Sequence, residues 1–339
     1  MLLLRMLRLL PCAAAAASPP LNVITILSDD QGYGDTGHTC DNSTGLCALT
    51  PHIDALARSS HSAVFSRFYA AAGVCSPTRA ALLTGRTNER DCIFSALPCD
   101  SEDPAPICAQ GSDLQGALPT SEFTTAKAAA KSTLGNYSTI MLGKWHLGDL
   151  WDKKLPGMSH KYRVSSPGTA GFDQWLATQA EASSSMSNCG CFQVDHADPG
   201  PPPPAGYKNH TGCGPYKSDT RPCAGIRPHG DQCVVGGGVR SNWCYPCTDY
   251  YGSNTSDARG VTPLQELGVK EPGDDSDFLI GRFETFLRKT VAAQRPFYAH
   301  ICLHSIHEPH PAMPEYYALY AKDPDYLGTL TQMDAQFGR

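Results

Sequence analysis

The sequence has no basic block and no long uninterrupted apolar run, and it is poor in charge. Charged residues make up 18% of the 339 residues, and the formal net charge is −6. Without a stripe of Lys or Arg, nothing favours nucleic acid as a partner. Pro19 and Pro20 break the apolar stretch that follows Arg8, which argues against a stable membrane span. The hydrophobic share of 41% excludes wholesale disorder and provides for a core.

Cysteine, by contrast, is abundant, and the 15 residues are too many for a typical reducing compartment. Residues 1–18 combine two arginines, no acid and an alanine run, which predicts a secretory signal peptide, with an organellar transit peptide as the weaker alternative. Sequons for N-glycosylation begin at Asn42, Asn136, Asn209 and Asn254. These features predict a secreted or lumenal protein, in the lysosome or the endoplasmic reticulum.

Short apolar strands alternate with helical segments along the chain. The expected strands are 21–27, which reads as a buried parallel strand, 137–142 and 296–303. The expected helices are one that Thr50 caps and Pro51 begins, one from Cys75 to Leu83, and further ones at 123–134, 278–288 and 326–337. This order predicts an α/β fold with a mainly parallel central sheet flanked by helices.

Residues 185–260 differ from the rest of the chain. They contain the proline run 201–204, many glycines and seven cysteines from Cys189 to Cys247. We expect a disulfide-stapled insertion, carried by a single domain that spans 19–339. The pair Cys244 and Cys247 also has zinc-ligand spacing, but in a secreted chain disulfides are favoured.

Polar side chains follow the carboxyl end of each expected strand, where open α/β sheets bind ligands. They are Asp29, Asp30, Lys144, His146, His304 and His307. Cys75 begins a helix that closes at Gly85, so its side chain is expected at the positive end of the helix dipole, which favours anions. Arg79, one turn further on, suits an anion or a modified side chain at that position.

Residues 75–86, CSPTRAALLTGR, resemble the signature of the sulfatase family, C-x-P-x-R followed by a leucine-rich turn and T-G-R. The resemblance implies that a formylglycine-generating enzyme oxidises Cys75 to an aldehyde, which hydrates to a geminal diol. One hydroxyl of the diol attacks sulfur and displaces the alcohol. The other hydroxyl then loses its proton and expels sulfate, so that one hard step becomes two.

Residues 22–37, NVITILSDDQGYGDTG, resemble the opening strand of the same family with its metal-binding Asp pair. Adjacent carboxylates favour a hard cation such as Ca²⁺ or Mg²⁺. The resemblance implies calcium, bound by Asp29, Asp30 and the modified Cys75. Gln31 is not counted among the ligands.

Residues 143–148, GKWHLG, and 296–309 resemble two further family motifs, the second ending in H-x-P. The first implies that Lys144 contacts the hydrated aldehyde and that His146 is the base in sulfate expulsion; an extended backbone would place both on one face. The second implies that His307 contacts sulfate and protonates the leaving alcohol. His304 and His310 are alternatives, as is a His-rich loop that binds a transition metal.

The resemblance covers most of 21–182 and 270–339 and implies a sulfated small molecule or carbohydrate as the substrate. The family's second metal pair, usually Asp-Asn, and its sulfate-gripping lysine have no counterpart before Arg339. We therefore expect an incomplete N-terminal catalytic domain that binds metal weakly and turns over poorly. Two alternatives stay open: a phosphate or phosphonate ester hydrolase of the alkaline phosphatase superfamily, and a truncated, inactive binding protein.

Cysteine pairing gives a last expectation. Cys12 lies in the leader, Cys75 is modified and Cys302 lies inside an apolar strand, so we expect these three to stay unpaired. The remaining twelve cysteines allow up to six disulfides.

Overall fold

The computed structural model describes residues 20–96, 117–178 and 276–339, apart from 42, 44, 45, 134, 149, 151–164, 308, 309 and 311. It also gives the backbone of five short strands between 190 and 253. The expected signal peptide, the sequons at Asn42, Asn209 and Asn254, and the side chains of the Cys-rich insertion lie outside the described residues. Asn136 is exposed in the loop before a strand of the main sheet.

The main sheet is mostly parallel, as the sequence predicts, and its strand order is β1-β9-β2-β3-β8. Its parallel strands are β1 (Val23–Leu27), β9 (Phe297–Cys302), β2 (Ser138–Lys144) and β3 (Gln174–Thr178), and β8 (Tyr251–Ser253) pairs antiparallel with β3. A second, antiparallel sheet contains β4 (Gly190–Gln193), β7 (Gly238–Tyr245), β6 (Gln232–Val235) and β5 (Ile226–His229).

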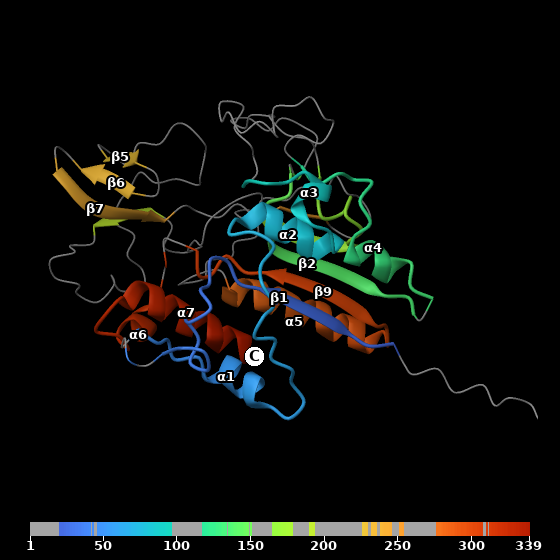
Figure 1. Cartoon of the computed structure of the whole chain (residues 1–339), viewed down its shortest axis with the longest axis horizontal. Coiled ribbons are helices and arrows are strands. Elements are labelled where there is room, and N and C mark those ends of the chain that lie inside the picture. The colour runs from blue at the N-terminus through green and yellow to red at the C-terminus, as the bar shows by residue number, and fades with distance from the viewer. Residues whose placement is uncertain are drawn as a thin grey trace, which may run out of the picture.

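Helices cover both faces of the main sheet (Figure 1). On one face α2 (Cys75–Thr84) and α4 (Thr125–Ala130) pack on the sheet, and the short α3 (Asn88–Asp91) follows α2. On the other face α5 (Ser276–Ala292) packs on β2 and β9, together with α7 (Pro324–Phe337). Because successive side chains of a strand point to opposite faces, Met141 joins the first core while Ile140 and Leu142 join the second.

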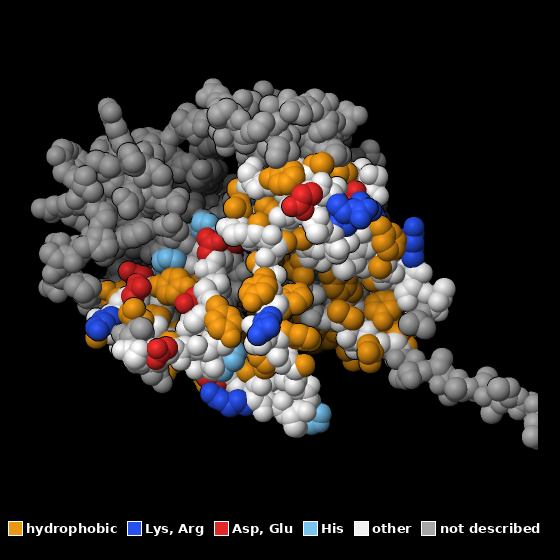
Figure 2. Space-filling model, viewed as in Figure 1, with side chains coloured by type: hydrophobic (Ala, Val, Ile, Leu, Met, Phe, Trp, Pro, Cys, Tyr) orange, Lys and Arg blue, Asp and Glu red, His pale blue; other side chains and the backbone are white. Residues whose placement is uncertain are grey.

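β1 corrects one expectation, because it is not a buried strand. It lies at the edge of the sheet as described, pairs with β9 on one side, and leaves Val23 and Ile24 44% and 48% exposed. Its apolar, β-branched sequence predicts a strand but not the number of its neighbours. Figure 2 shows hydrophobic side chains spread over the face that includes β1.

α1 (Pro51–Arg58) begins where expected, but its amino terminus is bound by a side chain from far along the sequence. The carboxylate of Asp334, in α7, accepts from the backbone N–H groups of His52 and Ile53 at 3.1 and 2.8 Å. The expected cap, Thr50, makes no capping hydrogen bond; its hydroxyl accepts from Gly37 N and donates to Asp54. A carboxylate satisfies the unpaired N–H groups of the first turn and favours the helix dipole, so α7 fixes α1.

The cysteines agree with the expectation in part. Cys40 and Cys47 form a disulfide, and Cys302 is free and buried, as predicted. Cys92 is also free, which lowers the upper limit of six disulfides to five. Its neighbours in sequence, Cys99 and Cys108, lie outside the described residues. None of the described helices, which include the four-residue α6 (Pro314–Tyr317), is long and apolar enough to cross a bilayer.

Candidate active site

α2 places Cys75 at the carboxyl edge of the sheet. The helix begins at Cys75 with Pro77 in its first turn, and it ends at Thr84, followed by Gly85 with φ +69°. Pro is favoured in a first turn and Gly at a left-handed C-terminal position, so the local sequence dictates both ends. Cys75 therefore lies beside the unpaired N–H groups of the helix start, and Arg79 lies one turn further along, fully buried.

Asp29 is the centre of the site and joins three predicted residues. Its Oδ2 lies 2.7 Å from Nζ of Lys144, and its Oδ1 lies 3.3 Å from Nη2 of Arg79. The thiol of Cys75 donates to the same Oδ1 at 3.3 Å, and Lys144 Nζ lies 3.7 Å from the Cys75 sulfur. The first strand, the helix and the second strand thus meet at one carboxylate, as the strand-end rule predicts.

The charges of this group decide its protonation. Burial by itself raises the pKa of Asp29, but the cations of Arg79 and Lys144 outweigh it and hold that pKa well below its usual range. Burial raises the pKa of the Cys75 thiol, and the negative charge of Asp29 raises it further. The positive charge of Lys144 lowers it but only partly offsets these effects. Asp29 is therefore a carboxylate at neutral pH, and the unmodified Cys75 is a neutral thiol that donates to it.

Gly143 allows Lys144 to reach this position. Its φ is +93°, and a Cβ at this residue would lie 1.9 Å from the carbonyl oxygen of Cys302. Only glycine combines that φ with so close an approach of β2 to β9. Arg79 then donates from Nη1 to the carbonyl of Lys144 at 2.8 Å, which fixes the backbone at the end of β2.

Asp30 and His307 form the outer part of the site. The loop after β1 is tied to the loop after β9 by two backbone hydrogen bonds, from Asp29 N to Ser305 O and from Ile306 N to Asp29 O. This brings Nε2 of His307 to 3.4 Å from Oδ2 of Asp30, with side chains 23% and 56% exposed. Asp30 has φ +57°, an uncommon value for a residue with a side chain and one that is frequent at functional sites.

The other three histidines take different positions. His146 is buried just beyond β2, and its φ of +55° shows that the backbone is not extended there. The prediction that His146 shares a face with Lys144 assumed an extended backbone and is therefore wrong. His304 is buried, with Nε2 2.7 Å from the hydroxyl of Thr178 at the end of β3. His310 stacks edge-on against the ring of Tyr326 at 5.1 Å. His307 is therefore the histidine that faces the acidic pair, in preference to the two alternatives.

The acidic pair meets part of the requirement for a hard cation. One ligand atom each from Asp29, Asp30 and Cys75 lies within 4.8 Å of the other two. Two carboxylates suit Ca²⁺, but Ca²⁺ takes about six to eight oxygen ligands and so needs more donors than these. The unmodified thiol of Cys75 is a soft ligand, which Ca²⁺ does not favour. Both oxygens of Asp29 already contact Lys144 and Arg79. The donor chemistry fits calcium, whereas the number of donors among the described residues does not complete its shell.

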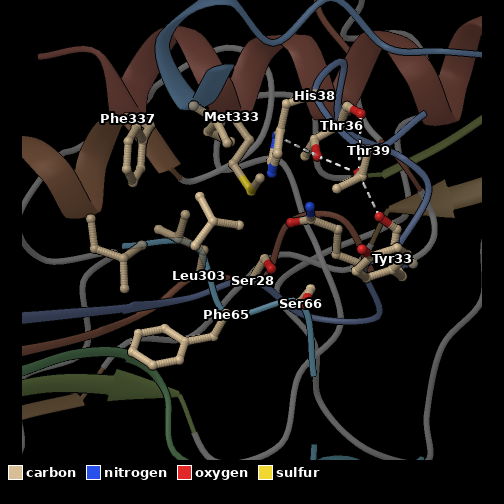
Figure 3. A pocket seen from close by; sticks show the side chains of 15 residues that line it. Ser28, Tyr33, Thr36, His38, Thr39, Phe65, Ser66, Leu303, Met333 and Phe337 are labelled. Carbon is tan, nitrogen blue, oxygen red and sulfur yellow. Dashed lines mark hydrogen bonds between the residues drawn. The ribbon is translucent and has the colours of Figure 1, made fainter. Parts of the chain in front are cut away.

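A cavity of about 410 Å³ lies beside the site, lined by residues at the carboxyl end of β1, by residues 64–66 and by α7. Figure 3 shows a polar end, where Thr36 bonds His38 and Thr39 at 3.1 and 2.9 Å, and an apolar end with Phe65, Leu303 and Phe337. Neither this cavity nor β3 is predicted from the sequence. The five-residue β3, QWLAT, has neither strict alternation nor the β-branched residues of β1, so its pattern does not predict a strand.

The sheet order and the site at its carboxyl edge define an α/β protein of the alkaline phosphatase-like class. Comparison with known proteins narrows the class further. The model of the Sulfatase family matches residues 21–339, and the chain belongs to the sulfatase family. The family inferred from the motifs is thereby confirmed.

Individual relatives agree with this assignment. N-acetylgalactosamine-6-sulfatase of Rattus norvegicus is 32% identical over 177 residues, which cover 52% of this chain and 29% of that protein. Arylsulfatase A of Homo sapiens is 37% identical over 144 residues, which cover 42% of this chain and 24% of that protein.

Solved structures share the fold over most of the chain. The crystal structure of Ps i-CgsB covers 94% of this chain and 53% of its own, with a TM-score of 0.56 and 25% identity. Its structure in complex with k-i-k-neocarrahexaose has a TM-score of 0.57 at 23% identity. The chain thus spans about half the length of the solved relative and matches less than a third of each curated relative.

Proposed function

We propose that this chain carries the nucleophile of a sulfate ester hydrolase, a formylglycine made from Cys75. The observation that supports the proposal most is the position of Cys75. It heads α2, donates to Asp29, and lies 3.7 Å from Lys144, with Arg79 one turn below. An anionic substrate at this point meets the helix dipole and two buried cations.

Each group of the site has a part in the proposed reaction. A hydrated aldehyde at position 75 supplies a hydroxyl that attacks sulfur, so that the ester oxygen leaves as an alcohol. Lys144 and Arg79 stabilise the negative charge on the attacked group and on residue 75, and Asp29 holds both cations in place. His307 donates the proton that the leaving alcohol takes up, and His146 accepts the proton that is lost when sulfate is expelled.

Calcium is the proposed metal, held by Asp29, Asp30 and an oxygen of the modified residue 75. When bound, it withdraws charge from the sulfate oxygens. Because the described residues provide few of its ligands, binding to this chain is expected to be weak, with a Kd of about 1 mM. Titration of CaCl₂ into the 339-residue chain by calorimetry measures it. Stoichiometric binding at micromolar calcium would contradict the proposal of a partial shell.

The proposed substrate is a sulfated carbohydrate or a smaller sulfate ester. Support comes from the names of two relatives, an N-acetylgalactosamine-6-sulfatase and an arylsulfatase, and from the oligosaccharide complex of the solved relative. We further propose a secreted or lumenal location, where the formylglycine-generating enzyme acts. The disulfide between Cys40 and Cys47 and the exposed sequon at Asn136 support it.

The deciding experiment expresses the whole chain in a secretory host that contains the formylglycine-generating enzyme. Mass spectrometry of the tryptic peptide Phe68–Arg79 then reports whether sulfur at Cys75 has been replaced by an aldehyde oxygen. Turnover of an aryl sulfate is measured in parallel, with Cys75→Ala as the inactive control. An unmodified thiol in the parent chain would overturn the proposed nucleophile.

Two other functions give different results in the same assays. A phosphate ester hydrolase of the same fold would turn over an aryl phosphate faster than the aryl sulfate. A binding protein without turnover would bind inorganic sulfate yet leave both esters intact. The partial metal shell is the observation that favours this second candidate.

A further inference from the structure

A sequon for N-glycosylation, formed by Asn136, Tyr137 and Ser138, lies where β2 begins. β2 and β9 are parallel neighbours, and Ser138 pairs in register with Phe297. Asn136, two residues before Ser138, therefore lies beside Arg295, two residues before Phe297. Because parallel strands all begin at one edge of their sheet, this pair lies at the amino edge, opposite the candidate active site.

Arg295 holds both the backbone and the side chain of Asn136. Its Nε donates to the backbone carbonyl of Asn136 at 3.1 Å, and its Nη2 donates to Oδ1 of Asn136 at 3.0 Å and to the carbonyl of Tyr137 at 3.2 Å. A guanidinium has donors only, so the oxygen of the Asn136 amide, and not its nitrogen, must face Arg295. The three hydrogen bonds thus form a clamp that fixes the direction of the amide group.

The amide nitrogen of Asn136 takes no part in this clamp. The residue is exposed, and among the described residues none accepts a hydrogen bond from Nδ2. N-glycosylation adds a sugar at that nitrogen and leaves the carbonyl oxygen an acceptor, so a glycan and the Arg295 clamp are compatible. Lys144 lies eight residues further on, about 25 Å along an extended strand, so a glycan on Asn136 leaves the candidate active site open.

We propose that Asn136 carries an N-linked glycan and that Arg295 orients it. The donor is a lipid-linked oligosaccharide pyrophosphate of the secretory pathway. A bond forms between Nδ2 and the first sugar carbon, the bond from that carbon to the pyrophosphate oxygen breaks, and Nδ2 loses one proton. The lipid pyrophosphate is the leaving group. This proposal shares with the proposed function only the secretory location, and it does not depend on sulfate chemistry.

The fold also determines when the sugar is transferred. Ser138, whose hydroxyl the sequon requires, is 8% exposed in the folded chain, and its backbone N–H donates to the carbonyl of Pro296 at 2.9 Å. Pro296 follows Ser138 by about 160 residues, which take roughly 10–30 s to synthesise. Transfer to Asn136 therefore precedes the pairing of β2 with β9, and the clamp forms on a side chain that already carries its glycan.

Mass spectrometry of the secreted 339-residue chain tests the proposal. Peptide N-glycosidase in H₂¹⁸O converts a glycosylated asparagine to ¹⁸O-labelled aspartate, and we expect this label at position 136. Ser138→Ala is expected to abolish it, whereas Ser138→Thr keeps the sequon and the label. An unlabelled Asn136 in the secreted parent chain overturns the proposal, and so does failure of the chain to enter the secretory pathway. A labelled Asn136 beside an unmodified Cys75 overturns the proposed nucleophile and leaves the glycan standing.

The role of Arg295 is measured by the rate at which the same enzyme labels Asn136 in the folded glycoprotein. We expect Arg295→Ala to be labelled about fivefold faster than the parent chain, because the hydrogen bonds that hold the asparagine against the sheet are lost. Arg288→Ala, which removes an exposed arginine from its ion pair with Glu284 in α5, is the control and should leave the rate unchanged. Equal rates in Arg295→Ala and the parent chain overturn the clamp.

Occupancy of Asn136 separates the clamp from the transfer itself. Since transfer precedes folding, the glycosylated fraction is expected to be equal in the parent chain, Arg295→Ala and Arg288→Ala. Labelling after denaturation, when the clamp is absent in every chain, measures this fraction. A lower occupancy in Arg295→Ala alone would show that Arg295 acts before the strands pair and would overturn the proposed order of events.

Discussion

β2 and β1 both end in residues of the candidate site, yet they hold these residues very differently. Every residue of β2 is buried, and so is Lys144 at its end. β1 is half exposed along its length, and Asp30 beyond its end is 56% exposed. The inner part of the site, which contains Cys75, Arg79, Asp29 and Lys144, is therefore fixed by burial and mutual ion pairs. In the outer part, the partly exposed side chains of Asp30 and His307 form an ion-pair contact of 3.4 Å.

The difference shows how the site gains its rigidity. Buried ions cannot exchange partners for water, so each cation of the inner part keeps Asp29 as its counter-charge. The outer pair faces solvent, where an ion pair contributes little and a cation or substrate can replace it.

Asp29→Asn is expected to have the largest effect. It leaves the buried charges of Lys144 and Arg79 without their carboxylate, which costs about 4 kcal/mol of unfolding free energy. Urea unfolding measures the loss. Asp30→Asn serves as the matched variant in the outer part, with an expected cost below about 0.5 kcal/mol. Similar losses in both variants would remove the distinction between inner and outer parts.

Gly143→Ala is expected to lower the free energy of unfolding by about 3 kcal/mol, the second-largest loss. Its Cβ would collide with the Cys302 carbonyl, and its φ is unfavourable to alanine. Gly281→Ala in α5 is the control, since a Cβ there meets no atom within 4 Å. Alanine favours a helix over glycine, so the control is expected to gain about 0.5 kcal/mol or more. Equal stability of Gly143→Ala and the parent chain in urea would show that the close approach of β2 to β9 is not needed.

The buried His300 is expected to make stability fall in acid. Its pKa is lowered from 6.5 to about 3, so above pH 6.5 it is neutral in both states and has no effect. Below pH 6.5 the unfolded chain binds a proton that the folded chain does not, and about 2 kcal/mol is lost between pH 6.5 and pH 5.

His300→Gln removes the titrating imidazole. Between pH 6.5 and pH 5 its unfolding free energy should therefore fall by about 2 kcal/mol less than that of the parent chain. The groups that face His300 are Arg79 from α2 and Tyr298 and Cys302 from its own strand, and none of them titrates between pH 3 and pH 6.5. Parallel pH profiles for the parent chain and His300→Gln would contradict the prediction.

The smallest effect concerns calcium. Lys144→Met removes a cation from Asp29 and should tighten calcium binding about tenfold, since the metal no longer competes with the ammonium at Oδ2. Calorimetry with CaCl₂ measures the change. Lys289→Met, at the exposed end of α5, is the control and should leave the affinity unchanged. A weaker affinity in Lys144→Met would mean that Lys144 supports the metal site instead of competing with it.

Local sequence predicted those features that local physics determines. The apolar strands ending at Leu27, Lys144 and Cys302 follow from β-branched runs, and α2 follows from Pro77 and Gly85. The strand-end rule then brought Asp29 and Lys144 together correctly. A separate expectation, that Lys144 and His146 share one face of an extended chain, was wrong, because His146 has a positive φ. The buried His300 was not singled out from the sequence, because no local pattern marks a histidine that is hydrogen-bonded within the core.

Neighbours along the chain were enough to predict the family, three strands of the main sheet and the residues at the carboxyl ends of those strands. Three other features become evident only in the folded chain: β1 is half exposed, Asp334 binds the start of α1, and Asp29 rather than Asp30 receives both cations. Each of these depends on which distant segment lies beside which. Burial and charge pairing depend on the distances between such segments in space, and separation along the chain does not predict those distances.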